Sequence, residues 1–226
     1  MINHIARLLD AAQLGALQAL LGDGAWEDGK ATAGFQSARV KHNLQLPQDS
    51  AAARQAGEIV VRALERHAEF VSAALPRHVY PPLFNRYESG MAFGAHVDNA
   101  VRQIPGSHHR LRIDVSATVF LTPPEDYDGG ELVIEDTFGT HAVKLAAGDM
   151  VVYPASSLHR VQPVTRGARM ASFFWVQSMV RDDGARALLY EMDTGIRELT
   201  GSGADAAALL RLTACYHNLL RRWADL

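Results

Sequence analysis

The chain has 226 residues, of which 48% are hydrophobic, and this is enough for one domain with a substantial core. Its net charge of −3 and its lack of a long basic run argue against a nucleic-acid-binding surface. A single cysteine, Cys215, cannot form an internal disulfide, so we expect a cytoplasmic protein.

Two helical patterns occupy the start of the chain. It begins MINHIARLLDAAQLGALQALL, where polar and charged residues interrupt the apolar ones, so we expect neither a membrane span nor a signal peptide. Asp10 and Gln13 have the spacing of a capping box, and leucines then recur along one helical face. Ser50 can cap a second helix that runs to about Leu75, where Pro76 ends it.

From His78 the pattern changes to short β-rich runs separated by turn residues such as Gly129-Gly130. The runs are HVYPPLFNRY, MAFGAHVD, LRIDVSATVFLT, GELVIED, HAVKL, DMVVYPA, RVQPV and RMASFFWVQS. About eight short strands without intervening helices are typical of a jelly roll or a similar double-sheet barrel. This part of the chain is therefore expected to carry the β-structure.

The end of the chain is again expected to be helical, over residues 182–199 and 204–225, which are rich in alanine and leucine. The expected fold class is α+β, a double-stranded β-helix (jelly-roll) barrel flanked by helices. Residues 1–77 would form an N-terminal helical support region, 78–180 the barrel and 181–226 a helical extension. Several leucines of the tail are expected either to pack internally or to form a homo-oligomer surface: Leu209, Leu210, Leu212, Leu219 and Leu220.

His96-Val97-Asp98 closes the strand-like segment MAFGAHVD. In a strand, residues i and i+2 point to the same face, so His96 and Asp98 can reach one metal ion. Two histidines and one carboxylate are typical of non-haem iron(II) oxygenases, which keep the remaining metal positions open. The pattern alone is weak, because 10 histidines and 25 acidic residues in 226 give about one His-x-acidic triplet by chance.

A second triplet of this kind, His67-Ala68-Glu69, lies within the second expected helix. In a helix, residues i and i+2 lie on different sides and cannot chelate one ion. We therefore interpret this triplet as part of a solvated helix face. Its presence illustrates that a His-x-acidic triplet can occur by chance.

His159 and Arg169 strengthen the first triplet. His159 follows the loop 155–158 and precedes another predicted strand, so it can supply the second histidine. Arg169 comes ten residues later, at the start of the apolar strand RMASFFWVQS. A charge that enters so apolar a strand should be paired if it points inward, and a planar guanidinium fits the carboxylate of a dicarboxylate co-substrate.

The segments DGGELVIEDTFG and VKLAAGDMVVYPASSLHRVQPVTRGARMASFFWVQSMVR resemble the PKHD-type hydroxylases, bacterial members of the prolyl-4-hydroxylase-like branch of the Fe(II)/2-oxoglutarate-dependent dioxygenases. The resemblance covers essentially the whole chain. It implies that His96, Asp98 and His159 are the catalytic iron ligands and that Arg169 binds the distal carboxylate of 2-oxoglutarate. It also implies that Tyr87, nine residues before His96, lies near this co-substrate.

The chemistry that the resemblance implies is hydroxylation. 2-Oxoglutarate and O2 would be consumed and succinate and CO2 released, with ascorbate as the accessory reductant and an unidentified small molecule or peptide as substrate. Relatives that halogenate lack the carboxylate, so Asp98 implies a hydroxylase. Some branches place a hydroxyl residue two positions after the arginine, where this chain has Ala171. A second hydrogen bond to the distal carboxylate must then come from elsewhere.

Other interpretations stay open from the residues alone. A non-catalytic barrel that senses iron or 2-oxoglutarate would keep the same residues, whereas a cupin-like isomerase or storage barrel would not require Arg169. Tyr87 is equally compatible with ordinary strand packing. The loop 101–112, which contains His108 and His109, is either a lid over the site or a solvated loop.

Overall fold

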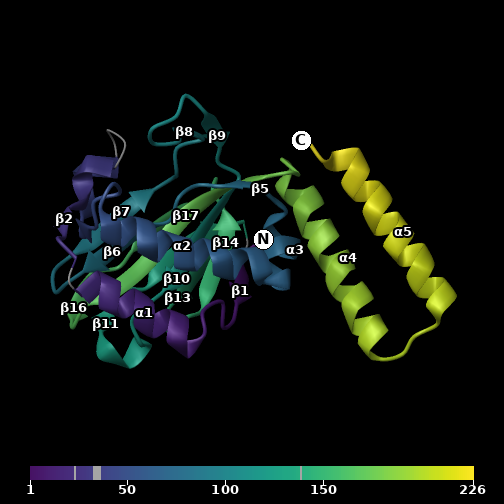
Figure 1. The fold of residues 1–226 in the computed structure, drawn as a ribbon, viewed down its shortest axis with the longest axis horizontal. Helices are drawn as coiled ribbons and strands as arrows, with labels where there is room; N and C mark the ends of the chain where they lie inside the picture. The colour runs from purple at the N-terminus through teal and green to yellow at the C-terminus, as the bar shows by residue number, and fades with distance from the viewer. Residues whose placement is uncertain (23, 33–36, 138) are drawn as a thin grey trace.

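The computed structural model describes residues 1–22, 24–32, 37–137 and 139–226. Antiparallel strands form two main sheets. Helices pack on one of these sheets, and a helical hairpin lies at the C-terminus (Figure 1). Short 3-10 helices lie at Gly29–Thr32, Ser37–Arg39 and Pro124–Asp126.

The larger sheet has the strand order β1-β14-β10-β17-β6-β4-β2, and β5 also pairs with β17. Its strands are β1 (Asn3–Ile5), β2 (Glu27–Asp28), β4 (Leu44–Gln45), β5 (Pro76–Val79), β6 (Leu83–Tyr87), β10 (Val115–Phe120), β14 (Met150–Pro154) and β17 (Arg169–Ser178). Strands distant in sequence are therefore neighbours, since β17 lies between β10 and β6.

The smaller sheet has the order β13-β12-β15-β7-β3. Its strands are β3 (Lys41–His42), β7 (Ala92–His96), β12 (Leu132–Asp136), β13 (Gly139–Val143) and β15 (Leu158–Val161). Two further pairs stand apart from both sheets: β8 (Val101–Gln103) with β9 (Arg110–Arg112), and β11 (Asp128–Gly129) with β16 (Val164–Arg166). The segment expected to be a lid or a solvated loop is thus a small hairpin.

The two sheets face each other across an apolar layer. Phe120 and Val151 from the larger sheet pack in one cluster with Leu132, Ile134 and Val161 from the smaller one. Side chains alternate between the two faces of a strand. In β17, Phe174 and Val176 accordingly belong to the cluster under the helices, while Trp175 belongs to a different cluster.

Helices α1 (Ala11–Gly22), α2 (Ala51–Arg66) and α3 (Ala68–Ala74) cover the outer face of the larger sheet. The predicted capping box is present, since the Gln13 amide N–H donates to the Asp10 carboxylate at 2.8 Å and the Asp10 N–H donates back to the Gln13 side chain at 2.9 Å. Ser50 caps α2 by accepting the Ala53 N–H at 3.1 Å. Both predicted helix starts are confirmed.

The prediction of one continuous helix up to Leu75 is wrong. The backbone of His67 is extended and separates α2 from α3, and this break allows Phe70 to pack edge-to-face on Phe174, with ring centroids 6.4 Å apart. His67 is therefore not inside a helix, and the geometric reason for dismissing His67-Ala68-Glu69 does not hold. Glu69 instead accepts a hydrogen bond from the Tyr190 hydroxyl at 3.1 Å.

The sequence also gave no indication of β1 to β4, because runs of two or three residues show no periodicity. Before residue 78 the chain supplies strands to both sheets as well as the expected helices.

The C-terminal helices are confirmed as α4 (Asp183–Gly201) and α5 (Ala206–Trp223), which form a hairpin beside the sheets (Figure 1). Asp182 and Asp205 cap them. Leu219 and Leu220 of α5 are partly buried against a cluster that contains Val180 and Leu189. Leu210, in contrast, is 71% exposed. Within the described residues, no helix combines the length and the apolar character needed to cross a membrane.

Gly129, at the irregular pairing of β11 with β16, has a backbone conformation and a close neighbour that only glycine fits. Its φ is +71°, and a Cβ there would lie 2.1 Å from the carbonyl oxygen of Pro163. Gly129→Ala is expected to lower the free energy of unfolding by roughly 2–4 kcal/mol, because the clash adds to the strain of a left-handed alanine. Gly90→Ala is the matched control, since its φ is +83° but its Cβ would meet nothing within 4 Å. Equal destabilisation of both variants in urea denaturation would refute the close approach.

Candidate metal centre

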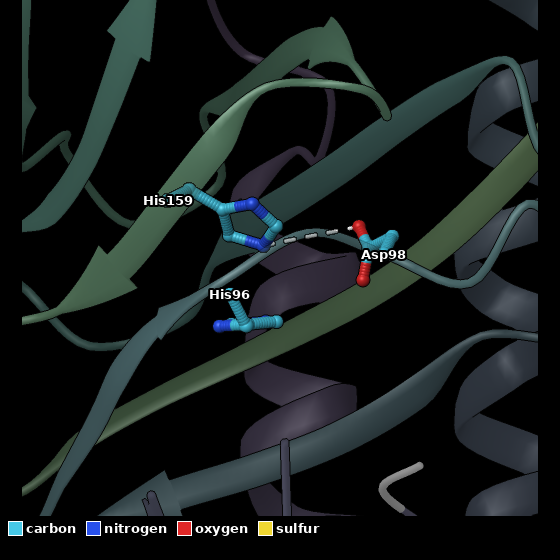
Figure 2. A group of neighbouring side chains, drawn as sticks. All are labelled: His96, Asp98 and His159. Atoms are coloured by element: carbon cyan, nitrogen blue, oxygen red, sulfur yellow. Dashed lines mark ion pairs between the residues drawn. The ribbon is translucent and has the colours of Figure 1, made fainter. Parts of the chain in front are cut away.

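His96 and His159 lie opposite each other on neighbouring strands of the smaller sheet. His96 is the last residue of β7, His159 lies in β15, and the two are direct partners in the antiparallel register. Their rings face the same space, with centroids 4.2 Å apart (Figure 2). The register of two strands thus brings together histidines that are far apart in sequence.

Asp98 completes the group from the segment that follows β7. Its Oδ2 atom lies 3.8 Å from the Nε2 atom of His159 (Figure 2) and accepts a hydrogen bond from the Ser116 hydroxyl at 2.6 Å. One ligand atom each from His96, Asp98 and His159 lie within 4.8 Å of one another. This is the only group of three or more potential metal-binding side chains found in the part of the chain that the structure describes.

Backbone carbonyl groups fix the tautomer of both histidines. The Nδ1 atom of His96 lies 2.9 Å from the carbonyl oxygen of Gly94, and that of His159 lies 3.0 Å from the carbonyl oxygen of Ser157. A carbonyl oxygen only accepts, so each Nδ1 carries the hydrogen and donates it. Each Nε2 is left with a lone pair in the shared space, which is the arrangement a metal-binding histidine needs.

Burial keeps His96 neutral. It lowers the pKa of His96 to about 4, and the nearby His159 lowers it further. Phe93 stacks on the His96 ring at 3.7 Å, and Tyr153 meets the His159 ring edge-on at 5.2 Å. The two rings are therefore held in place, and His96 is unprotonated at neutral pH, as metal binding requires.

Arg169 is a buried charge without an acidic partner among the described residues. It is 1% exposed, its Nε and Nη1 atoms have no hydrogen-bond partner there, and no ion pair there includes it. Its Cζ atom lies 5.4 Å from the centre of the Tyr87 ring and 5.2 Å from that of Phe120. Burial of an unpaired guanidinium lowers stability by roughly several kcal/mol, unless a bound anion compensates its charge. The geometry fits a carboxylate bound at this point.

Gly130 makes room for this arginine. A Cβ at Gly130, whose φ is +69°, would lie 3.1 Å from both the Cδ atom of Arg169 and the Cε2 atom of Tyr127. The turn glycine identified in the sequence thus has a packing role that the sequence did not reveal.

One pocket between the two sheets contains all five side chains singled out in the sequence. They are His96, Asp98, His159, Arg169 and Tyr87. Burial raises the pKa of the Tyr87 hydroxyl to about 12, although the charge of Arg169 opposes this shift. The hydroxyl therefore keeps its proton and can donate a hydrogen bond.

Sequence analysis missed two cations that line the same pocket, Lys41 and Arg102. Lys41 lies on a two-residue strand and belongs to no motif, and Arg102 lies in the segment expected to be a lid or loop. Burial lowers the pKa of Lys41 to about 8, and the charge of Arg102 contributes to the same shift. The apolar strand FFWV gave a partial signal, since Phe173 and Trp175 also line the pocket.

Comparison with known proteins identifies the family. Residues 82–177 match the 2OG-Fe(II) oxygenase superfamily, and residues 183–225 match the PKHD-type hydroxylase C-terminal domain. A PKHD-type hydroxylase of Methylobacterium nodulans is 60% identical and PKHD-type hydroxylase PiuC of Pseudomonas aeruginosa 56% identical, each over the whole length of both chains.

Solved structures agree at the level of the fold. A Pseudomonas putida prolyl-4-hydroxylase aligns with a TM-score of 0.54 and 21% identity, over 78% of this chain and 92% of that one. A Trichoplax adhaerens prolyl hydroxylase, solved in complex with a hypoxia inducible factor peptide fragment, aligns with a TM-score of 0.58 and 13% identity, over 83% and 86%. The chain belongs to the PKHD-type hydroxylases of the 2OG-Fe(II) oxygenase superfamily and is a dioxygenase.

Proposed function

We propose that the protein is an Fe(II)- and 2-oxoglutarate-dependent hydroxylase in which His96, Asp98 and His159 hold the iron and Arg169 holds the distal carboxylate of 2-oxoglutarate. The observation that carries this proposal is the presence, in one pocket, of a two-histidine, one-carboxylate group and a buried guanidinium without an acidic partner in the described chain. Family membership implies Fe(2+), 2-oxoglutarate and O2. The assignment of roles to these four side chains is our inference.

We also propose that the two facing sheets are the double-stranded β-helix of this superfamily. The antiparallel pairing and the pocket between the sheets support this description. On this view residues 78–180 are the catalytic core, 1–77 support it, and 181–226 form a separate helical extension.

The bound iron and co-substrate would supply the oxidation, in which one oxygen atom of O2 enters a substrate C–H bond and the other enters succinate as CO2 is released. The chain's own part is to hold these groups. The fixed tautomers of His96 and His159 present Nε2 lone pairs, and Asp98 supplies a negative charge. Ser116 orients that carboxylate by its hydrogen bond, and three protein ligands leave the remaining metal positions open.

Arg169 would orient the co-substrate by two parallel hydrogen bonds to its distal carboxylate. Ala171 has no hydroxyl group and cannot donate a hydrogen bond to the distal carboxylate. The Tyr87 hydroxyl is our candidate for this second donor, because it is protonated and its ring lies near Arg169. The aromatic residues that line the pocket would limit the entry of water once co-substrate and substrate are bound. Ascorbate is proposed only as an accessory reductant that keeps the iron reduced.

A turnover assay tests the reaction class. The purified protein with Fe(II), 2-oxoglutarate and O2 is expected to form succinate, at least at the slow rate of uncoupled turnover, and to form none when any of the three is omitted. Mass spectrometry of metabolite and peptide mixtures would then search for the hydroxylated product. Tight binding of iron and 2-oxoglutarate without O2-dependent succinate in any mixture would instead favour the non-catalytic sensor.

Tyr87→Phe tests the second donor. Removing the hydroxyl is expected to raise the KM for 2-oxoglutarate by about tenfold to 100-fold, because a hydrogen bond to a charged group contributes about 1.5–3 kcal/mol, with little change in kcat. Tyr190→Phe is the control, because its hydroxyl donates to Glu69 in a helical region outside the pocket. An unchanged KM in Tyr87→Phe would assign this tyrosine to strand packing alone.

A further inference from the structure

Asn43 lies beside the proposed co-substrate site, at the point where the chain passes from one sheet to the other. It is the residue between β3 and β4, and it lines the pocket. In the antiparallel pairing of β4 with β6, Leu44 lies opposite Arg86, and the same register places Asn43 opposite Tyr87. Tyr87 in turn pairs with Arg169 on β17. Side chains directly opposite each other on one face of a sheet interact, so Asn43, Tyr87 and Arg169 form one row across the sheet.

Gly29 leaves the space that the Asn43 side chain occupies. The Gly29 N–H donates to the backbone carbonyl oxygen of Asn43 at 2.9 Å. A Cβ at Gly29 would lie 2.0 Å from the Oδ1 atom of Asn43 and 3.1 Å from its Cγ atom, so it would displace the amide. Asn43 is also only 2% exposed. Its side chain is therefore held in a closed site, with the amide oxygen directed at Gly29.

The Asn43 amide interacts with the Tyr87 hydroxyl. Apart from this tyrosine, no described residue offers the Nδ2 or Oδ1 atom of Asn43 a hydrogen bond. Burial raises the pKa of Tyr87 to about 12, whereas the charge of Arg169 and the Asn43 side chain lower it. A hydrogen-bond donor stabilises the phenolate and lowers the pKa of a tyrosine, while an acceptor would raise it. The Nδ2 atom of Asn43 therefore faces the tyrosine, in agreement with an Oδ1 atom that faces Gly29.

This arrangement decides where the hydrogen of the Tyr87 hydroxyl can go. A tyrosine hydroxyl has one hydrogen to donate and lone pairs that accept. The Nδ2 group of Asn43 has no acceptor and takes up a lone pair of the oxygen. The guanidinium of Arg169 has no acceptor either. The hydrogen is therefore available to an acceptor that enters the pocket beside Arg169.

We propose that Asn43 is a positioning residue for the co-substrate: its Nδ2 atom donates to the oxygen of Tyr87 and thereby directs the hydroxyl hydrogen to the distal carboxylate of 2-oxoglutarate. This inference rests on the proposed function, in which Arg169 and Tyr87 bind that carboxylate. Asn43 acts through Tyr87 and does not itself bind 2-oxoglutarate. The segment before residue 78 thus contributes to co-substrate binding as well as to support of the barrel.

Anaerobic calorimetric titration of the Fe(II)-loaded protein with 2-oxoglutarate tests this inference. Asn43→Leu removes the amide but keeps a side chain of similar size, and it is expected to raise the Kd about threefold to tenfold. In the Tyr87→Phe background the same substitution is expected to change the Kd less than about twofold, because the group that Asn43 orients is gone. A merely structural role of Asn43 would instead give the same loss in both backgrounds.

Gly29→Ala displaces the Asn43 amide from outside the pocket, because Gly29 does not line it. This variant is expected to raise the Kd in the same way as Asn43→Leu. Gly24→Ala is the matched control, since its Cβ would lie 2.6 Å from the Cδ1 atom of Leu46 and neither residue lines the pocket. Gln18→Leu controls for the loss of an amide, because the Gln18 side chain donates to a backbone carbonyl oxygen at 3.0 Å outside the pocket. Both controls should leave the Kd unchanged.

An unchanged Kd in Asn43→Leu or in Tyr87→Phe would overturn the inference. So would a loss of affinity in Asn43→Leu that is equally large without the Tyr87 hydroxyl. Should Asn43→Leu fail to fold, as judged by circular dichroism, Gly29→Ala decides alone by the same criteria. Failure of the proposed function is a separate result, in which Arg169→Leu binds 2-oxoglutarate as tightly as the unaltered protein.

Discussion

His159→Ala is expected to lower Fe(II)-dependent succinate formation by at least about 100-fold. Loss of a residue that only orients a metal ligand already costs about 10- to 100-fold, so loss of the ligand itself should cost no less. His96→Ala and Asp98→Ala are expected to act in the same way. The protein should remain folded, because all three side chains converge on a pocket and leave the apolar cluster between the sheets intact.

His141→Ala is the control for this series. His141 lies on β13, its side chain is 45% exposed, and it contacts Asp136 at 3.0 Å outside the pocket. Its loss is expected to leave succinate formation and Fe(II) affinity unchanged. Circular dichroism of each variant separates loss of iron from loss of fold. Succinate formation undiminished in His159→Ala would remove this residue from the proposed iron site.

Arg169→Leu is expected to change binding and stability in opposite directions. The affinity for 2-oxoglutarate should fall by roughly 2–5 kcal/mol, because the distal carboxylate loses its charged partner. The unliganded protein should become more stable by roughly 1–3 kcal/mol, because an apolar side chain replaces a buried charge that lacks an acidic partner in the described structure. Anaerobic calorimetry and urea denaturation measure the two effects.

Arg166→Leu is the matched control for Arg169→Leu. Arg166 lies three residues earlier on the same stretch of chain, its side chain is 57% exposed, and it pairs with Asp128 at 2.7 Å. Its replacement should leave the affinity for 2-oxoglutarate unchanged. A loss of stability in Arg169→Leu together with unchanged 2-oxoglutarate affinity would show that the arginine serves the fold and not the co-substrate.

The sequence pointed to the candidate site because the proposed chemistry depends on residue type and strand context. His96 and Asp98 become informative only with His159 and Arg169, and strand register then brings the four into one pocket. The resemblance to a known family directed attention to the same residues. His67-Ala68-Glu69 was set aside because of its expected helical geometry, and that geometry is wrong at His67.

Features that depend on tertiary contacts could not be predicted from local sequence patterns. The break at His67 places Phe70 on Phe174, a contact between segments about a hundred residues apart that no local pattern encodes. The two-residue strands near the start of the chain exist because β6 and β7 offer them an edge. Lys41 reaches the pocket through one of these strands, so the second set of cations became visible only in three dimensions.

The most direct test of the account is a crystal structure of the protein soaked anaerobically with Fe(II) and 2-oxoglutarate. The account predicts one metal ion bound by the Nε2 atoms of His96 and His159 and the carboxylate of Asp98, and a 2-oxoglutarate distal carboxylate paired with the guanidinium of Arg169. A metal ion held by other side chains, or a distal carboxylate bound away from Arg169, would contradict it.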